Sequence, residues 1–410
     1  MTNIESTFTK EKNYIETYGK SVVFHCNHYN RSLQQTIEDA DYLDFDKILV
    51  KASAEIIFEQ LTGYFSKNTG LNVKEKLAFA SEIFRYSGFG LLDFSFINEN
   101  GGKIISKISH YGTSLKLNFG HRTKSGEYFD KGFILGTLSA IKGTLSGKYF
   151  SDDLEIIQNK SISLNDDFSE YEISLENSTI KKQFENFVSI PSRKIETTVD
   201  EDMIVGAVSQ LPLIGNEEGL IPAFGVYLTR MYADYYNKIS FRFEEEMKKE
   251  TGTYDLSKDL LIEAGHICAF YTFGGIMSSD EWYALIKPMF KTKEDWIHGM
   301  ISVVNCLGWG VWRVEELIPN EKLVIRAYQD YESLGYLEWF GKADHPISYL
   351  LTGGCTGLMS LLYDGDITQK PELTKDYYYQ LFNDNRAFKA EQTKCLAMGD
   401  DYSEVVVKRV

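Results

Sequence analysis

The densest group of residues able to do chemistry is a run near the N-terminus, Phe24-His25-Cys26-Asn27-His28-Tyr29-Asn30. A cysteine beside an imidazole can become an activated thiolate, and two histidines with a cysteine can bind a soft metal. If the run is a strand, Cys26 and His28 point to the same side and form a thiol–imidazole pair. The alternative is a buried cysteine and a hydrogen-bonded histidine in an ordinary core.

A second cysteine-containing run, Ile267-Cys268-Ala269-Phe270-Tyr271, aligns with the first when the chain is compared with itself. In this alignment the cysteine and the tyrosine are kept, while apolar residues replace both histidines. We therefore interpret the cysteine and tyrosine as architectural. The histidines belong to the first run alone, and this asymmetry points to function there.

Aromatic side chains form another group of candidates, because rings can stack on an aromatic ligand or simply fill a core. His110 and Asp330 also align, each just before a tyrosine, where a polar group can orient a ligand or lie at the surface. The predicted catalytic residues are Cys26 and His28. The predicted ligand-binding residues are His25, Tyr29, Phe89, His110, Tyr111, Cys268, Tyr271, Trp309, Trp312 and Tyr331.

Composition sets limits on the class of protein. The chain has 410 residues, of which 43% are hydrophobic and 25% charged, as in ordinary globular proteins. A net charge of −16 and the lack of a basic stripe argue against nucleic-acid and anionic-membrane partners. Five cysteines without C-x-x-C spacing and a polar N-terminus predict a cytoplasmic protein with reduced thiols.

Familiar enzyme motifs do not occur. The sequence has no phosphate-binding G-x-x-x-x-G-K-[ST] loop, and Gly88-x-Gly90 leads into a predicted strand, unlike a dinucleotide fingerprint. H-E-x-x-H and G-x-S-x-G are also missing. We predict no cofactor and no metal.

Four blocks of the sequence recur in the same order, which predicts an internal duplication. Gly88-Phe89-Gly90 matches Gly308-Trp309-Gly310, and the spacing is kept through the predicted hairpin that follows. The other matching blocks are the runs around Cys26 and Cys268, the pairs Gly132/Gly136 and Gly353/Gly357, and the ends Asp166–Glu170 and Asp400–Glu404. Glycines at that spacing allow a helix to approach its neighbour closely.

The repeats predict an α/β (α+β) chain with a first module at residues 1–174, a connector at 175–261 and a second module at 262–410. Helices are expected at 77–86 and 296–306, and hairpin strands at 89–97, 103–108, 311–317 and 322–328. Strands at 171–173 and 405–407 are expected to close the two copies. After Pro222, the spacing of Phe224, Tyr227, Leu228 and Met231 predicts one long helix.

Three parts of the second copy resemble the 4-vinyl reductase domain, also called the hydrocarbon-binding domain. They are Gly308-Trp309-Gly310, the Gly353-to-Gly357 helix and the ending Glu391–Ser403. The resemblance covers about a hundred residues and extends more weakly to the first copy. It implies a ligand-sensor fold, shared with phenol-sensing domains of regulators, haem-based nitric-oxide sensors and vesicle-tethering subunits. It also implies an apolar cavity for a small aromatic or lipid-like molecule.

Many members of that family hold zinc with three cysteines, but this sequence departs from the pattern. Cys395 is kept, whereas the other two positions are Ser403 and about Ser348. In the first copy, Ser161 and Ser169 stand at the two positions of the final block. Serine hydroxyls are poor zinc ligands beside thiolate and imidazole, so we expect no such zinc site.

The sequence therefore predicts an intracellular sensor or carrier for a small apolar or aromatic molecule, either a homodimer or an internal pseudo-dimer. The alternative is a cofactor-independent enzyme that uses Cys26 and His28. We expect the first copy to be the working one. Trp309 and Trp312 replace Phe89 and Leu92 in the second copy, and larger rings are expected to shrink a cavity there.

Overall fold

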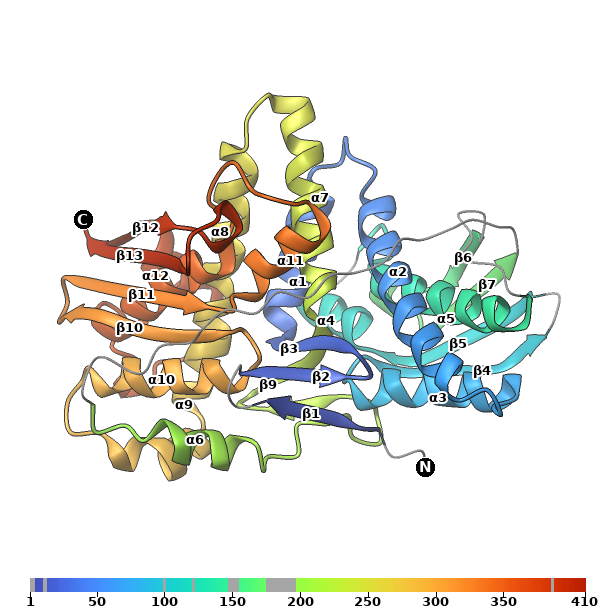
Figure 1. The fold of residues 1–410 in the computed structure, drawn as a ribbon, viewed down its shortest axis with the longest axis horizontal. Coiled ribbons are helices and arrows are strands. Elements are labelled where there is room, and N and C mark those ends of the chain that lie inside the picture. Colours follow the sequence, from blue (N-terminus) through green and yellow to red (C-terminus); the bar gives the residue numbers. More distant parts are fainter. Residues whose placement is uncertain are drawn as a thin grey trace.

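The computed structural model of the protein describes residues 4–9, 13–98, 101–119, 122–146, 155–174, 197–384 and 387–410. Three antiparallel sheets and packed helices make the fold α+β, as predicted. Figure 1 shows a five-stranded sheet in the middle, with a four-stranded sheet on either side of it.

The two four-stranded sheets repeat one topology. The first has the order β4-β5-β7-β6, from β4 (Gly90–Asn98), β5 (Gly101–Ser109), β6 (Glu155–Lys160) and β7 (Ser169–Ser174). The second has the order β10-β11-β13-β12, from β10 (Val311–Ile318), β11 (Lys322–Tyr328), β12 (Phe388–Lys394) and β13 (Ser403–Arg409). Both predicted hairpins are confirmed, although residues 99 and 100 of the first predicted turn lie outside the described residues.

The glycines that enter the two hairpins have the same backbone conformation. Gly88 and Gly308 have φ of 83° and 85°, and Gly90 and Gly310 have φ of 119° and 117°. These positive angles favour glycine, because a side chain there is strained. The predicted match between these two blocks therefore holds in three dimensions.

Equivalent helices accompany the two sheets. We call the first sheet with α3 (Val73–Tyr86), α4 (His110–Phe119) and α5 (Tyr128–Ser146) the first module. The second sheet with α10 (Asp295–Cys306), α11 (Tyr331–Trp339) and α12 (Tyr349–Tyr363) is the second module. The predicted helices in α3 and α10 are confirmed. The sequence patterns did not predict α4, α11 or the strands β6 and β12.

The paired glycines bring helices close together, as predicted. A Cβ added to Gly132 of α5 would lie 2.4 Å from the Val50 carbonyl oxygen of α2 (Phe45–Lys67). A Cβ added to Gly353 of α12 would lie 2.3 Å from the Ile262 carbonyl oxygen of α8 (Asp255–Cys268). The packing of α2 on α5 is thus equivalent to the packing of α8 on α12.

The connector differs from its prediction. Residues 175–196 lie outside the described residues, and α6 (Glu201–Val208) follows them. The expected single helix after Pro222 is wrong, because β8 (Ile221–Ala223) and β9 (Val226–Tyr232) form a hairpin before α7 (Ala233–Thr251) begins. Pairing with β3 overrides the helical spacing of the apolar residues in β9.

The middle sheet joins the two ends of the fold. Its order is β1-β2-β3-β9-β8, with β1 (Ser6–Thr9), β2 (Tyr14–Thr17) and β3 (Lys20–Cys26). The strands β3 and β9 are antiparallel and pair with Phe24 opposite Arg230. Each is followed at once by a helix, α1 (Asn27–Asp39) after β3 and α7 after β9.

One long helical stretch, Asp255–Ser278, runs from α8 through the π turn η2 (Ala269–Phe273) into α9 (Gly274–Ser278). Its length and composition would suit a membrane span, but 67% of its apolar window is buried inside the protein, as in a core helix. The remaining elements are η1 (Ile162–Leu164), η3 (Trp282–Ile286), η4 (Lys287–Met289), η5 (Ile367–Gln369), α13 (Lys375–Tyr379), η6 (Gln380–Asp384) and η7 (Leu396–Met398).

Candidate ligand-binding site

The run at residues 24–30 is half strand and half helix. The strand β3 ends at Cys26, and α1 begins at Asn27. Strand alternation therefore does not place Cys26 and His28 on one side, and that step of the sequence interpretation is wrong. The ladder of β3 with β9 ends at the same place, at the pair Cys26 and Leu228.

Cys26 and His28 have different partners. The Thr272 hydroxyl donates to Cys26 Sγ at 3.0 Å, whereas the His28 ring stacks on Tyr271 with 4.0 Å between centroids and 9° between planes. Burial raises the pKa of the Cys26 thiol and lowers the pKa of His28 to about 4. Both groups are therefore neutral near pH 7, which is the opposite of a thiolate–imidazolium pair.

The proposed match of Cys26 and Tyr29 with Cys268 and Tyr271 is also wrong. Cys26 ends a strand, whereas Cys268 is the last residue of α8, and Tyr271 lies in the π turn that follows. The counterpart of α8 is α2, as the glycine contacts show. Similar residues therefore coincide here by composition, without structural equivalence.

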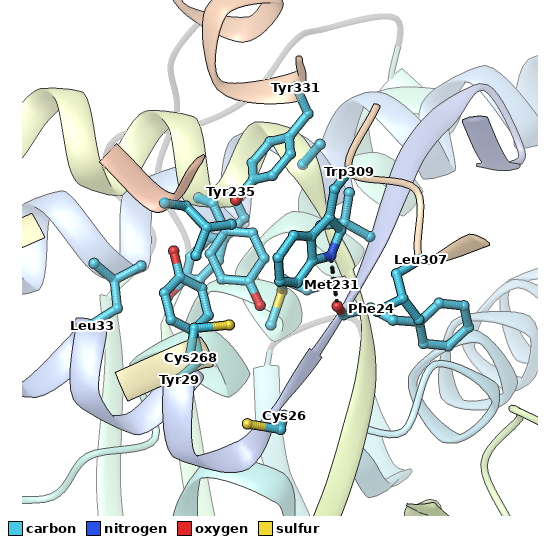
Figure 2. Close-up of a cluster of buried hydrophobic side chains, with 14 of the residues drawn as sticks. Phe24, Cys26, Tyr29, Leu33, Met231, Tyr235, Cys268, Leu307, Trp309 and Tyr331 are labelled. Atoms are coloured by element: carbon cyan, nitrogen blue, oxygen red, sulfur yellow. Dashed lines mark hydrogen bonds between the residues drawn. The ribbon is translucent and has the colours of Figure 1, made fainter. Parts of the chain in front are cut away.

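Five of the predicted residues nevertheless meet in one buried cluster, which we call the His25 cluster: His25, Tyr29, Cys268, Trp309 and Tyr331. Figure 2 shows the rings of Tyr29, Trp309 and Tyr331 gathered beside Cys268, with Trp309 Nε1 donating to the Phe24 carbonyl oxygen at 2.9 Å. The His25 ring is fully buried between Trp309 and Tyr29, at centroid distances of 4.5 and 4.4 Å. The cluster therefore combines residues that the sequence assigned to two separate pockets.

Both ring nitrogens of His25 face a polar atom. Cys268 Sγ lies 3.5 Å from Nδ1, and the Tyr331 hydroxyl lies 3.5 Å from Nε2. Burial holds the pKa of His25 well below its usual value. The ring is therefore a neutral aromatic group at physiological pH, and proton transfer by it near neutrality is disfavoured.

His110 lies in a second buried network. Asn30 Nδ2 donates to His110 Nε2 at 3.1 Å and to Thr229 Oγ1 at 2.9 Å, and the Tyr236 hydroxyl donates to Asn30 Oδ1. Because an amide nitrogen can only donate, Nε2 is the acceptor and the imidazole proton is on Nδ1. Burial lowers the pKa of His110 to about 3, so the ring is neutral.

Tyr111 belongs to a hydroxyl-rich region inside the first module. Its hydroxyl lies against that of Tyr235 from α7, and both are close to the fully buried Asp130 of α5. The Tyr171 hydroxyl of β7 donates to Asp130 Oδ2 at 3.4 Å, and Ser109 also bonds this carboxyl. Burial raises the pKa of Asp130 well above its usual value, which favours the neutral carboxyl.

Asp130 Oδ1, His110 Nδ1 and Thr137 Oγ1 are among the buried polar atoms without a hydrogen-bond partner within the described part of the chain. Asp130 and Thr137 lie two turns apart on α5, so they share a face of the helix. By the glycine spacing, their counterparts on α12 are the buried Leu351 and Leu358. The second module is thus apolar where the first is polar and unsatisfied.

The tryptophans of the second module compensate for lost volume. The Trp312 ring lies 3.5 Å from the position of a Cβ on Gly354, where the first module has Phe133. On the sheet, Trp312 therefore replaces Leu92, and on the helix, Gly354 replaces Phe133. The expectation that larger rings shrink a cavity ignored this exchange. Phe89, like Trp309, is buried, and it packs on Phe84 and Phe129.

Ser161, Ser169, Ser348 and Ser403, the serines that we compared with zinc-binding cysteines, lie in carboxylate–hydroxyl clusters. In the first module the buried Glu127 accepts from the hydroxyls of Ser161, Ser163 and Ser169 at 2.8–3.0 Å. In the second, the buried Asp330 accepts from Ser333, Ser348 and Ser403 at 2.5–3.1 Å, beside Cys395. In the described part of the chain, no group of three or more His, Cys, Asp or Glu is arranged to hold a metal ion.

Sequence reasoning missed Asp130, Thr137, Tyr235, Tyr236 and Thr272. Asp130 and Thr137 had a usable signal, because a helix that is otherwise apolar carries them on its buried face and the repeat replaces both with leucine. Tyr235 and Tyr236 had none, because they lie in the connector. Thr272 lies in the π turn η2. Such a turn forms where a helix contains extra backbone, and residue composition does not predict it.

No family model and no curated protein matches the chain, so the resemblance to the 4-vinyl reductase domain stays a prediction. Among solved structures, the chain is weakly similar to the phenol-responsive sensory domain of the transcription activator PoxR, solved with phenol. The alignment has a TM-score of 0.37 and 10% identity, and covers 51% of this chain and 89% of the other. A likeness this loose decides neither the fold nor the ligand.

Proposed function

We propose that the protein is an intracellular binding protein, a sensor or carrier, for a small molecule with an apolar or aromatic body. The site is the interior of the first module around Asp130, Thr137 and His110. The observation that carries the proposal is the group of unpartnered buried polar atoms there, two of which are on Asp130 and Thr137, side chains that the second module replaces with leucines.

Such atoms are costly in a folded protein. A buried donor or acceptor without a partner costs about 1–3 kcal/mol, and natural proteins leave few of them. Thr137 and Asp130 are both fully buried, so bulk solvent does not satisfy them. A bound molecule that pairs with them explains why the first module keeps them.

The surroundings favour a neutral ligand with one hydrogen-bonding group. A neutral carboxyl can donate and accept, and the His110 Nδ1 proton is a further donor. The rings of Phe89, Phe129 and Tyr111 pack near one another and offer an apolar surface. A small ring alcohol satisfies both requirements, whereas a carboxylate would be buried without a cation beside it.

The test uses phenol as a neutral ring alcohol and benzoate as its charged relative. We expect phenol to raise the Tm of the wild-type protein in a saturable way, and benzoate to leave it unchanged. Asp130→Leu installs the second-module residue and is expected to abolish the phenol shift. Thr137→Val removes a hydroxyl with no partner, so binding should weaken while the free energy of unfolding stays equal or rises by about 1 kcal/mol.

Leu351→Met is the matched control, since it changes the equivalent position of the second module and should leave the phenol shift intact. A phenol shift that survives Asp130→Leu would place the ligand elsewhere. A wild-type protein that responds to no neutral alcohol and carries no bound small molecule in native mass spectrometry would contradict the proposal.

The enzyme alternative has less support, because Cys26 and His28 contact different partners and both side chains are neutral. Cytoplasmic location is part of the proposal. The five cysteines are all buried and unpaired, which suits a reducing compartment.

A further inference from the structure

His25 is held as a bound aromatic molecule would be. Its ring is stacked on Trp309 at 23° and packed against Tyr29 at 31°. The edge of the Tyr236 ring meets it at 4.8 Å and 80°. Ring stacking and edge contacts of this geometry are the usual way in which proteins hold flat aromatic groups.

The polar contacts of His25 complete this resemblance to a bound ligand. One ring nitrogen faces Cys268 Sγ and the other faces the Tyr331 hydroxyl, each at 3.5 Å. Cys268 and Tyr331 begin or end helices of the second half of the chain, α8 and α11. The site therefore presents one polar contact to each ring nitrogen, beside aromatic rings.

The histidine and most of its surroundings come from opposite ends of the chain. His25 is on β3, whereas Cys268, Trp309 and Tyr331 are all on α8 or the second module. The backbone fixes this insertion, because Phe24 N donates to the Leu307 carbonyl oxygen at 2.9 Å. A side chain from one half of the protein thus fills the interior of the other half.

The local twofold of the β3–β9 pair identifies the corresponding residue for the first module. Because Phe24 lies opposite Arg230, the twofold between the two strands relates His25 to Met231. Met231 is fully buried and belongs to the buried cluster drawn in Figure 2. Methionine is flexible and adapts its shape to neighbours, whereas a stacked imidazole has a fixed shape and fixed polar contacts.

We propose that the second module contains a binding site for a flat aromatic heterocycle, and that His25 is its internal ligand. The side chain keeps the site closed in the wild-type protein. The first module, which has Met231 at the related position, lacks such a ligand. This inference goes beyond the proposed function and stands if phenol fails to bind the first module.

The chemical class follows from the contacts. A five-membered ring with two nitrogens in the positions of the His25 nitrogens can meet Cys268 and Tyr331 together. Imidazole has this geometry, and at pH 8 most of it is neutral, as the buried site requires. Blocking one nitrogen with a methyl group removes one hydrogen bond and adds bulk in the ring plane.

The experiment replaces the internal ligand with a free one. His25→Gly removes the imidazole, and thermal unfolding is followed at pH 8 with increasing imidazole. We expect a saturable rise in Tm for His25→Gly and none for the wild-type protein. Binding of 1-methylimidazole should be about tenfold weaker, as expected for one lost hydrogen bond. Adding Tyr331→Phe to His25→Gly should weaken imidazole binding to a similar degree.

Met231→Gly is the matched control, because it opens the related position, where a flexible methionine stands in place of a ring with two polar contacts, and imidazole should not stabilise it. An equal response of Met231→Gly and His25→Gly, or no response of His25→Gly, would overturn the inference. If His25→Gly is insoluble when expressed alone, soluble recovery with imidazole in the medium supports the inference, and insolubility in both conditions counts against it.

Discussion

At the scale of single residues, the two modules bury a carboxylate in the same place by different means. Glu127 lies at the entry to α5, whereas Asp330 comes from the start of α11, yet both gather serine hydroxyls from the final block of their module. A buried carboxyl group is tolerated where several donors surround it. These clusters tie the entry to the glycine helix to the last strands of each sheet.

The first prediction concerns Asp330. Asp330→Ala leaves the hydroxyls of Ser333, Ser348 and Ser403 without their shared acceptor, so we expect the free energy of unfolding to fall by about 2–4 kcal/mol. Chemical denaturation measures this directly. Asp259→Ala, at an exposed position on α8, should change stability by less than about 0.5 kcal/mol. Equal effects of the two variants would show that the cluster contributes nothing.

Residue-level prediction from sequence succeeded in part for a physical reason. Residue type shows which side chains can do chemistry, so His25, His110 and Tyr111 were predicted as site residues. Contacts between distant segments decide what a residue does, and the partners Tyr235, Tyr236 and Thr272 are on elements that no local pattern joins to them. The sequence therefore predicted several members of each cluster, but it did not predict which residues lie together.

At the scale of elements, glycine spacing was the most informative signal, because it reports backbone approach directly. The helical spacing after Pro222 failed, since apolar residues in a strand buried against helices can mimic it. We propose that the second copy begins at β9 instead of Ile262. The order strand, helix, helix at β3-α1-α2 then matches β9-α7-α8, and each second helix packs on its glycine helix.

The second prediction tests the glycine contacts. Gly353→Ala puts a Cβ 2.3 Å from the Ile262 carbonyl oxygen, so the helices must separate, and we expect a loss of about 1–3 kcal/mol. Gly63→Ala in α2 meets nothing within 4 Å and should instead gain about 0.5–1 kcal/mol, as alanine usually does in a helix. A gain in both variants, seen in thermal unfolding, would contradict the close packing.

The third prediction concerns the pH dependence of stability that Glu338, a residue of α11, is expected to cause. Burial, together with the charges of Asp234 and Glu59, raises the pKa of Glu338 to about 8, although Lys20 and Lys238 oppose the shift. The folded state therefore holds this proton more tightly than the unfolded state. Its stabilising effect is complete below the ordinary pKa of about 4.5 and is lost as pH rises through about 8.

Glu338→Gln removes this titration, so the free energy of unfolding should depend less on pH between 5 and 8 than in the wild-type protein. The measurement is urea denaturation at a series of pH values. Glu321→Gln, an exposed glutamate in the second hairpin, serves as the control and should leave the profile unchanged. A wild-type profile that does not fall over this range would contradict the assignment.

At the scale of the whole molecule, the two halves already form the kind of contact that a dimer makes between chains. The strands β3 and β9 pair across a local twofold, and the helices α2 and α7 are joined by the buried ion pair of Lys238 with Glu55 at 2.5 Å. We therefore propose an internal pseudo-dimer and expect light scattering to give the mass of one chain. A twofold mass that persists on dilution would contradict this.

The last prediction is that the molecule unfolds in one step. Two modules joined by a small interface usually unfold separately, but here each depends on the other's half for its interior. His25 fills the second module, and Trp309 Nε1 donates to the Phe24 carbonyl oxygen across the boundary. We expect a single calorimetric transition whose midpoint moves as a whole in Gly132→Ala and in Gly353→Ala. Each variant packs badly in a different module, so independent modules would show two transitions, with each variant lowering only its own.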